Sequence, residues 1–385
     1  MDKSIYCGRG TKVPYDDLML LLNVSFNRLT PDKDMKVLLP KLYQENDRPQ
    51  DQNYVILEDG ALAAAVGAYD HTLTVCGHKL ACRGIGNVAV HPDYRSKGYM
   101  TMTMNAALHD MISDGIAISA LSGRRQRYLY YGYDKAGTTY TYTVSRDNIR
   151  HVYGDLTVPY TVKEITDPDD PIIDSIVALN GKSPLVPSRA RERYLDIANS
   201  WNARLFAFVD GECFVGYCIS GKSSVSEIQT ADDAEFMNCV RSFFAYLGET
   251  FSISLPSHQI SYRKALSPFA ERATIGNAMS FNILNYRAVI EAFLALKLSY
   301  ETLPDGEITL LIHGYAGDER ICINVKDGKS AVKYIDDTVT PDYELDHTDA
   351  ISLLFSPISA IRDTSDFIIK AWFPLPLYLA HADGV

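Results

Sequence analysis

The chain has 385 residues, too many for one ordinary domain, and 46% of them are hydrophobic, which is enough for several cores. A formal net charge of −11 argues against nucleic acid or an anionic membrane surface as the main partner. The seven cysteines include no Cys-x-x-Cys pair, which argues against a disulfide framework or a zinc site and favours reduced thiols in the cytoplasm. Without a signal-peptide pattern or a run of about 18 apolar residues, we expect no membrane partner and no bound metal.

Two helices and then antiparallel strands are predicted for the N-terminal part. Apolar residues recur at helical spacing over 14–28, and a second helix is predicted over 35–44. Two strand pairs follow, each closed by a turn that ends in glycine: 53–58 with 61–69, and 72–76 with 78–85. This order alone indicates an α+β fold.

The stretch 86–101 carries the main functional signal. Residues 86–90 predict a strand, 91–93 a turn, and a helical pattern begins at Gly98. A helix start offers free backbone N–H groups and the positive end of the helix dipole, and Arg95 and Lys97 add positive charge. The stretch therefore predicts a site for a phosphate or pyrophosphate, although neither the GxxxxGK[ST] nor the GxGxxG pattern is present.

The text Val-x-Val-x-Pro followed by Arg-x-x-Gly-Tyr-Met resembles the acyl-CoA signature of the GCN5-related N-acetyltransferases, Arg/Gln-x-x-Gly-x-Gly/Ala. It departs at the last position, which is Met100, as the Eis-like (enhanced intracellular survival) branch of that superfamily tolerates. The resemblance implies acetyl-CoA as co-substrate. The residues that it implies for CoA binding are Val88, Ala89, Val90, Arg95, Ser96, Lys97, Gly98, Tyr99, Met100, Thr101, Gly123 and Arg124.

Residues 122–133 follow the next expected strand, 116–121, and by composition alone they indicate a surface helix with three arginines and several tyrosines. Eis-like proteins carry a Tyr-x-x-Phe/Tyr-Gly-Tyr segment here, whose first tyrosine is taken as the general acid. That register assigns the role to Tyr128, with Tyr130 and Tyr131 as the nearest alternatives. A phenol with a pKa of about 10 is protonated at neutral pH and can supply a proton to a departing thiolate.

A second unit is expected over 151–278, after a Pro- and Asp-rich linker within 147–174. Its predicted order is that of the first unit, but no Arg-x-x-Gly-x-Gly/Ala follows any of its strands. The resemblance therefore implies a second, degenerate acetyltransferase-like domain without a cofactor site. A strand over 138–144 is predicted to close the first unit. The elements predicted for the second unit are a helix over 188–199, strands over 204–209, 213–220 and 224–229, a helix over 232–247 and a strand over 251–255.

Residues 279–385 are expected to form a third unit that resembles a sterol-carrier-protein-like module. In isolation this module could bind lipid, but in a three-part chain a structural, substrate-wall role is preferred. The predicted elements are strands over 279–284, 306–313, 320–326 and 329–335, and helices over 286–297, 349–356 and 357–363.

The tail, 371–385, is apolar and aromatic, whereas most chain ends are polar and frayed, so we expect it to be packed. In Eis-like enzymes the C-terminus threads into the first domain and its α-carboxylate acts as the base, a role that would fall to Val385 here. Phe26, at the end of the first predicted helix, lines the amine pocket by the same analogy; core packing is an equal alternative.

The resemblance as a whole implies a cytoplasmic N-acetyltransferase that transfers an acetyl group to a primary amine of a cationic substrate. Aminoglycosides, polyamines and peptide lysines are the candidates. The architecture implied is tandem acetyltransferase-like domains over 1–150 and 151–278 with the third domain over 279–385, in a homo-oligomer, since relatives are commonly hexameric. Two alternatives remain open: use of another acyl-CoA, and a non-catalytic protein that senses CoA or binds an apolar ligand.

Overall fold

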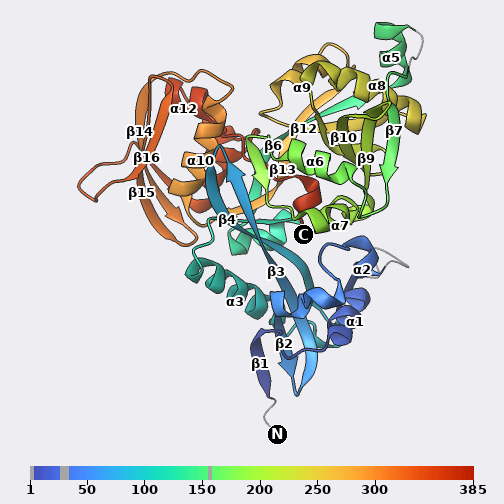
Figure 1. Cartoon of the computed structure of the whole chain (residues 1–385). Helices are drawn as coiled ribbons and strands as arrows, with labels where there is room; N and C mark the ends of the chain where they lie inside the picture. Colours follow the sequence, from blue (N-terminus) through green and yellow to red (C-terminus); the bar gives the residue numbers. More distant parts are fainter. Residues whose placement is uncertain (1–3, 27–33, 155–157) are drawn as a thin grey trace.

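The computed structural model describes residues 4–26, 34–154 and 158–385 of the chain, which form three lobes (Figure 1). Within these ranges the strands build a 13-stranded sheet and a four-stranded sheet. The larger sheet has the order β1-β2-β3-β4-β5-β13-β6-β12-β11-β10-β9-β7, with β8 paired to β3. The fold is therefore mixed α and β, as the sequence predicts.

The N-terminal lobe contains the predicted helices and hairpins. Its elements are β1 (Ile5–Arg9), α1 (Tyr15–Phe26), α2 (Met35–Leu38), β2 (Asn53–Glu58), β3 (Ala61–Val75), β4 (His78–Val90), α3 (Tyr99–Ser113), β5 (Ile118–Leu121) and α4 (Arg125–Tyr128). The next strand, β6 (Asp134–Val144), pairs with β12 and β13 above this lobe (Figure 1). The end of the helix predicted over 14–28 lies partly outside the described residues. The helix predicted over 35–44 is wrong in length: it ends at Leu38, because Pro40 disfavours a helical backbone at the residue before it.

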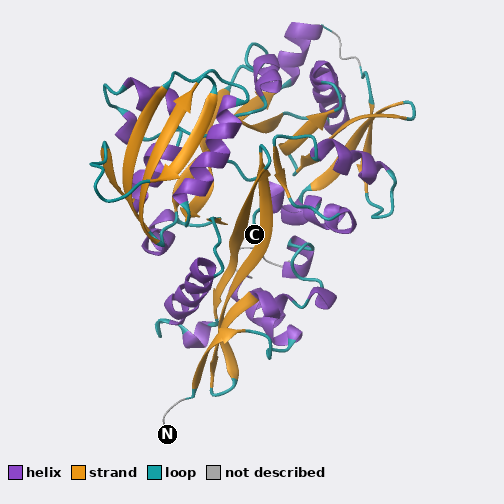
Figure 2. Cartoon of the chain, turned by 60° about the vertical axis from the view of Figure 1, so that its left-hand side comes forward, coloured by secondary structure: helices purple, strands orange, loops and turns teal. Residues whose placement is uncertain are grey.

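Strands β3 and β4 form one long hairpin where two short hairpins were predicted. The turn at Cys76-Gly77 is confirmed, with both residues at positive φ, but no turn separates 61–69 from 72–76. Asp70 continues the strand because it pairs with Arg83 of β4 in register, and the two side chains form an ion pair. The hairpin extends from the N-terminal lobe to the region between the other two lobes (Figures 1 and 2).

The second lobe repeats part of this arrangement. Its elements are α5 (Arg146–Tyr153), β7 (Thr161–Ile165), α6 (Ile172–Asn180), β8 (Leu185–Pro187), α7 (Tyr194–Ala198), β9 (Arg204–Asp210), β10 (Cys213–Ser220), β11 (Ser224–Thr230), α8 (Phe236–Leu247), β12 (Phe251–Pro256) and α9 (Ile260–Leu266). The stretch predicted as a linker thus holds α5 and β7, and the helix predicted over 188–199 shortens to α7. In both lobes a helix connects two parallel neighbours: β4–α3–β5 and β11–α8–β12.

The last part of the chain contributes to both sheets. Its elements are β13 (Ala273–Ile283), α10 (Tyr286–Leu298), β14 (Gly306–Gly314), β15 (Gly317–Lys326), β16 (Lys329–Tyr334), β17 (Tyr343–Asp346), α11 (His347–Phe355) and α12 (Phe367–Trp372). β13 lies between β5 and β6 in the large sheet, while β16-β15-β14-β17 form the small one. Over 357–363 only a short 3-10 turn, Ala360–Arg362, forms instead of the predicted helix.

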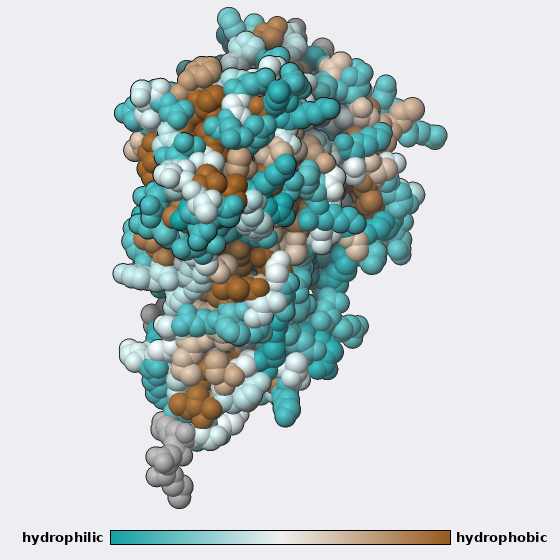
Figure 3. Space-filling view, turned by 90° about the vertical axis from the view of Figure 1, so that its left-hand side faces the viewer, coloured by the Kyte–Doolittle hydropathy of each residue, from teal (hydrophilic) through white to brown (hydrophobic). Residues whose placement is uncertain are grey.

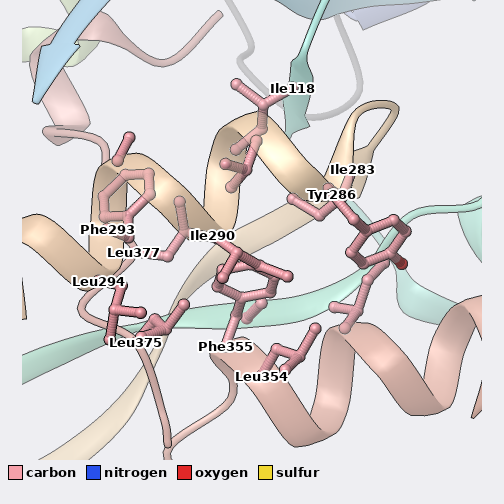
Figure 4. Close-up of a cluster of buried hydrophobic side chains, with 14 of the residues drawn as sticks. Ile118, Ile283, Tyr286, Ile290, Phe293, Leu294, Leu354, Phe355, Leu375 and Leu377 are labelled. Carbon is pink, nitrogen blue, oxygen red and sulfur yellow. The ribbon is translucent and has the colours of Figure 1, made fainter. Parts of the chain in front are cut away.

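The tail is packed, as predicted. Leu375 and Leu377 are fully buried beside α10 and α11, in the largest apolar cluster of the described residues (Figure 4). Full burial of such side chains contributes about 1.5–3 kcal/mol each, so the tail is held firmly. The surface in Figure 3 is mostly hydrophilic with scattered apolar side chains. Among the described residues, none of the helices has the length and apolar character needed to span a bilayer.

Candidate active site

A cavity of about 470 Å³ opens where β4 and β5 separate. The two strands pair in parallel as far as Ile85 and Leu121, after which β4 continues to Val90 while the chain leaves β5 for α4. The register of β4 against β3 shifts at this level, and Asn87 has a positive φ of 39°. Beyond Ile85 the backbone of β4 is no longer paired with β5, which leaves room for a ligand beside β4.

The wall of the cavity comes from all three lobes. The N-terminal lobe supplies most of it, the second lobe supplies one indole, and the tail supplies the C-terminal residue. The wall residues are Phe26, Met35, Leu38, Leu39, Ile85, Gly86, Asn87, Val88, Leu121, Ser122, Gly123, Arg124, Arg127, Tyr128, Trp201 and Val385.

Of the three tyrosines considered from the sequence, Tyr128 is the one on this wall. Its side chain is 7% exposed, whereas that of Tyr130 is 86% exposed and the Tyr131 hydroxyl donates to Thr101 Oγ1 over 3.1 Å. The ring of Tyr128 packs on Gly123, where a Cβ would lie only 2.4 Å from a ring carbon. Burial raises the pKa of Tyr128, and Arg127 partly opposes this, so the phenol is protonated at neutral pH.

Val385 lines the same cavity and packs against β4. A Cβ at Gly84 would lie 2.5 Å from Val385 Cγ2, and one at Gly86 would lie 3.2 Å from the Val385 carbonyl carbon. Glycine at these two positions therefore lets the C-terminal residue lie directly on the strand. Phe26, proposed from the sequence as a pocket residue, is half-buried on the same wall.

Three residues that the sequence analysis missed hold the last residues of the tail. The Lys41 ammonium donates to the carbonyls of Ala382 and Gly384, the latter over 2.6 Å, and the Trp201 indole N–H donates to Gly384 over 3.0 Å. Asp383 binds the Arg189 guanidinium through two hydrogen bonds of 2.8 Å. Their spacing in the chain forms no local motif, so nothing in the sequence pattern points to them.

The Arg189–Asp383 pair is buried, with side-chain exposures of 2% and 8%, and Arg189 also binds Glu227 over 2.7 and 2.8 Å. Burial opposes ionisation of Asp383, but the Arg189 guanidinium outweighs it and lowers the pKa of that carboxyl. One cation shared by two carboxylates connects the tail to β11. Burial likewise lowers the pKa of Lys41 to about 8.

The expected anion site at the start of α3 has the predicted backbone. Gly98 caps the helix with a positive φ of 77°, and Arg95, Ser96 and Gly98 are exposed. Lys97 differs from expectation: its ammonium binds both oxygens of the Glu58 carboxylate, over 2.8 and 2.9 Å, and Glu58 is 3% exposed. The charge of Lys97 is thus largely matched by a buried carboxylate, whereas Arg95 lies in solvent.

The other residues expected at the CoA site divide between wall and core. Val88, Gly123 and Arg124 line the cavity, while the side chains of Ala89, Val90 and Tyr99 pack into apolar clusters on either side of the sheet. The Tyr99 hydroxyl donates to Glu58, and Thr101 is exposed on the first turn of α3. Met100 is half-buried against the cluster that contains Met104 and Leu108, which accounts for an apolar residue where the signature has Gly or Ala.

β4 and β5 are parallel strands that separate beside the start of α3, where free N–H groups and Arg95 are available. This arrangement suits a ligand that carries both a thioester and a pyrophosphate. These features define an acyl-CoA-dependent acyltransferase. Residues 9–136 match the family model described as an acetyltransferase (GNAT) domain, a family that uses acetyl-CoA. The matched residues make up the N-terminal third of the chain.

Several solved structures share the fold over nine-tenths or more of the chain. A GCN5-related N-acetyltransferase from Anabaena variabilis has a TM-score of 0.68 at 16% identity, covering 98% of each chain. A probable N-acyltransferase from Enterococcus faecalis has a TM-score of 0.63 at 18% identity, covering 91% of this chain and 89% of that one. Eis1 from Mycobacterium abscessus has a TM-score of 0.59 at 14% identity, covering 99% of this chain and 98% of that one. At these identities the likeness is one of fold. Comparison with curated protein sequences gives no significant match.

Proposed function

We propose that the protein transfers an acetyl group from acetyl-CoA to a primary amine by direct attack. The ammonium proton passes first to the Val385 carboxylate, and the neutral nitrogen then attacks the thioester carbonyl. The carbon–sulfur bond breaks and the departing thiolate takes a proton from Tyr128. The second proton, which the nitrogen loses as the amide forms, returns through solvent to the Tyr128 phenolate. The observation that carries the proposal is that a buried phenol and the C-terminal residue share the wall of one cavity at the strand separation. Two groups with opposite proton-transfer roles are thereby available around one reacting centre.

Coenzyme A is proposed to bind along β4 and at the start of α3. The pyrophosphate would accept from the backbone N–H groups of residues 96–101, with Arg95 as the nearby cation. The pantetheine amides would pair with the backbone of residues 88–90, as an added strand would, with Gly123 and Arg124 on the other side of the groove. Because Lys97 is bound by Glu58, we assign it mainly to holding that loop.

A base is required because an alkyl amine with a pKa of about 10.4 is less than one part in a thousand neutral at pH 7. The proposed base is main chain, so the identity of the last side chain is unimportant and its placement matters most. The hydrogen bonds from Lys41, Trp201 and Arg189 to residues 382–384 support this assignment. They restrain the residues immediately before the carboxylate from two different lobes.

The second lobe is proposed to be a degenerate acetyltransferase-like domain. β11 and β12 pair in parallel at only two positions and then separate, as β4 and β5 do. In the turn that leads into α8, however, the backbone N–H of Ala234 donates to the Asp232 carboxylate over 2.9 Å, and Asp233 and Glu235 lie in the same turn. Carboxylates at that position would repel a pyrophosphate. The third part, proposed to be sterol-carrier-protein-like, supports the tail.

The test is acetyl-CoA-dependent release of CoA thiol by the purified protein with a broad panel of amines. Tyr128→Phe should lower kcat by roughly 10²–10⁴-fold with the Kd of acetyl-CoA unchanged, the range general acid catalysis supplies. Tyr130→Phe and Tyr131→Phe are matched controls that should keep kcat within a few-fold. Tight acetyl-CoA binding without thiol release for any amine would instead support the CoA-sensing alternative, and a full rate in Tyr128→Phe would remove the proposed acid.

A further inference from the structure

We infer that the acceptor of this acetyltransferase is a monoamine on an apolar body, such as an alkylamine or arylalkylamine, rather than a polycation. The inference rests on the proposed function and narrows the substrate class. It is carried by the lining of the cavity, by the charges around it and by its size. Each of these is a property of the described residues, independent of the roles assigned to Tyr128 and Val385.

The acceptor side of the cavity is apolar. Phe26 at the end of α1 and Met35, Leu38 and Leu39 in and after α2 line it, and Trp201 faces the same space from the second lobe. Water in contact with such a wall is displaced favourably by an apolar ligand surface. A polyamine or an aminoglycoside would instead bring hydroxyls or ammonium groups to a surface that offers them few hydrogen-bond partners.

Trp201 is held in this wall at a conformational cost. Its φ is +61°, and that of Asn202 is +60°, in the left-handed region that side chains other than glycine rarely adopt. The hydrogen bond from its indole N–H to Gly384 and an edge contact with the His381 ring oppose that cost. A large aromatic residue kept in a strained conformation at a cavity wall is typical of a site that shapes a ligand.

The charges around the cavity suit one ammonium group. Among the described wall residues there is no Asp or Glu, so the carboxylate of Val385 is the single anion there. Arg124 and Arg127 lie on the same wall, and the Lys41 ammonium lies 2.6 Å from the carbonyl of Gly384, next to Val385. Asp383 is paired with Arg189 and is unavailable. Among the described residues, a second ammonium of a polycation would therefore meet the like charges of Arg124 and Arg127 without a matching carboxylate.

The size of the cavity agrees with this chemistry. The cavity of about 470 Å³ must also receive the acetyl end of the pantetheine arm, since Val88, Gly123 and Arg124 belong to its wall. The remaining volume suits an alkyl chain or one aromatic ring, and an aminoglycoside with several linked rings would have to extend into solvent.

The experiment compares 2-phenylethylamine and hexylamine with spermidine and kanamycin on the full-length protein. We expect kcat/KM for the two apolar amines to exceed that for the polycations at least tenfold. In parallel, isothermal titration calorimetry of each amine into protein saturated with CoA measures binding without chemistry. Tighter binding of the apolar amines supports the inference even if no amine is acetylated, in which case the proposed function alone fails. Preference for spermidine or kanamycin in either measurement overturns the inference and leaves the acetyltransferase activity standing.

Phe26→Ala tests the wall itself. Removal of a half-buried ring should weaken binding of 2-phenylethylamine roughly tenfold or more, with little effect on the KM of acetyl-CoA. Val37→Ala is the matched control, because Val37 is 70% exposed on the neighbouring helix α2 and does not line the cavity. Unchanged amine binding in Phe26→Ala, with the control also unchanged, would contradict the assignment of this wall to the acceptor.

Discussion

Arg189 binds both carboxylate oxygens of Asp383, from Nε and Nη2 over 2.8 Å each, and the last residue of the chain lies two positions further on. A guanidinium fork on a carboxylate fixes orientation as well as distance. Because Arg189 is itself held by Glu227, the end of the tail is tied to the second lobe while its side chain packs on β4 of the first. The proposed active site thus depends on the relative placement of two lobes.

Asp383→Asn should lower kcat by roughly 10–100-fold with little change in the KM of acetyl-CoA. The amide keeps the shape of the carboxylate but loses its charge, so the tail is held less tightly and the terminal carboxylate shifts, and a misplacement of about 1 Å can cost such a factor. Steady-state kinetics measures the change. Asp363→Asn, at an exposed position, is the control.

Arg189→Met should lower both kcat and the free energy of unfolding more than Asp383→Asn does. It leaves Glu227 and Asp383 buried without their cation, a loss of about 3–5 kcal/mol in the free energy of unfolding. Chemical denaturation of the two variants separates the effects. Equal kcat for the wild type and Asp383→Asn would show that the ion pair has no part in placing the terminus.

Gly84→Ala should lower kcat roughly tenfold or more, and Val385→Ala in the same chain should restore most of it. The added Cβ would lie 2.5 Å from Val385 Cγ2 but 3.7 Å from its Cβ, so truncating the last side chain removes the clash. Val385→Ala alone should keep kcat within a few-fold, since the proposed base is main chain. A double-mutant cycle on kcat measures the coupling. A double variant as slow as Gly84→Ala would contradict the proposed contact.

Arg95→Gln and Lys97→Gln should have different effects although both remove a positive charge near α3. Loss of the exposed Arg95 should weaken acetyl-CoA binding roughly tenfold, as measured by calorimetry. Loss of Lys97 should change that Kd less but lower the free energy of unfolding by about 1–3 kcal/mol, because the buried Glu58 carboxylate loses its ion pair with the Lys97 ammonium. A larger increase in the Kd of acetyl-CoA for Lys97→Gln than for Arg95→Gln would show that Lys97 binds the cofactor.

Much of the fold follows from local pattern. β2, β10 and α10 begin where their alternation or helical spacing predicts, and the anion-binding helix start after the turn 91–93 is present. The early end of the second helix also has a local cause, since Pro40 disfavours a helical backbone at the residue before it.

Other features depend on contacts that no local pattern contains. Asp70 looks like a turn residue, but Arg83 on the neighbouring strand keeps it in an extended backbone. Trp201, Arg189 and Lys41 act on the tail from positions far apart in the chain, so their role follows only from the packing of the three lobes. The assignment of Tyr128 as the proposed acid depends on the family resemblance, because local sequence alone does not distinguish it from Tyr130 and Tyr131.

Burial of His258 should lower the free energy of unfolding in mild acid. It follows β12, its Nδ1 is buried with no hydrogen-bond partner among the described residues, and burial lowers the pKa of its side chain to about 4. The unfolded chain binds a proton near pH 6.5 while the folded chain does so only near 4, so stability is full above pH 6.5 and falls as the pH drops toward 4. Between pH 7 and pH 5 this residue should account for a decrease of about 2 kcal/mol in the free energy of unfolding. Denaturant titrations at both pH values should show that decrease to be smaller by this amount in His258→Asn. His109→Asn, at a side chain 82% exposed, should behave as the wild type. The same decrease in His258→Asn and in the wild type would mean that His258 takes up its proton equally in the folded and unfolded chain.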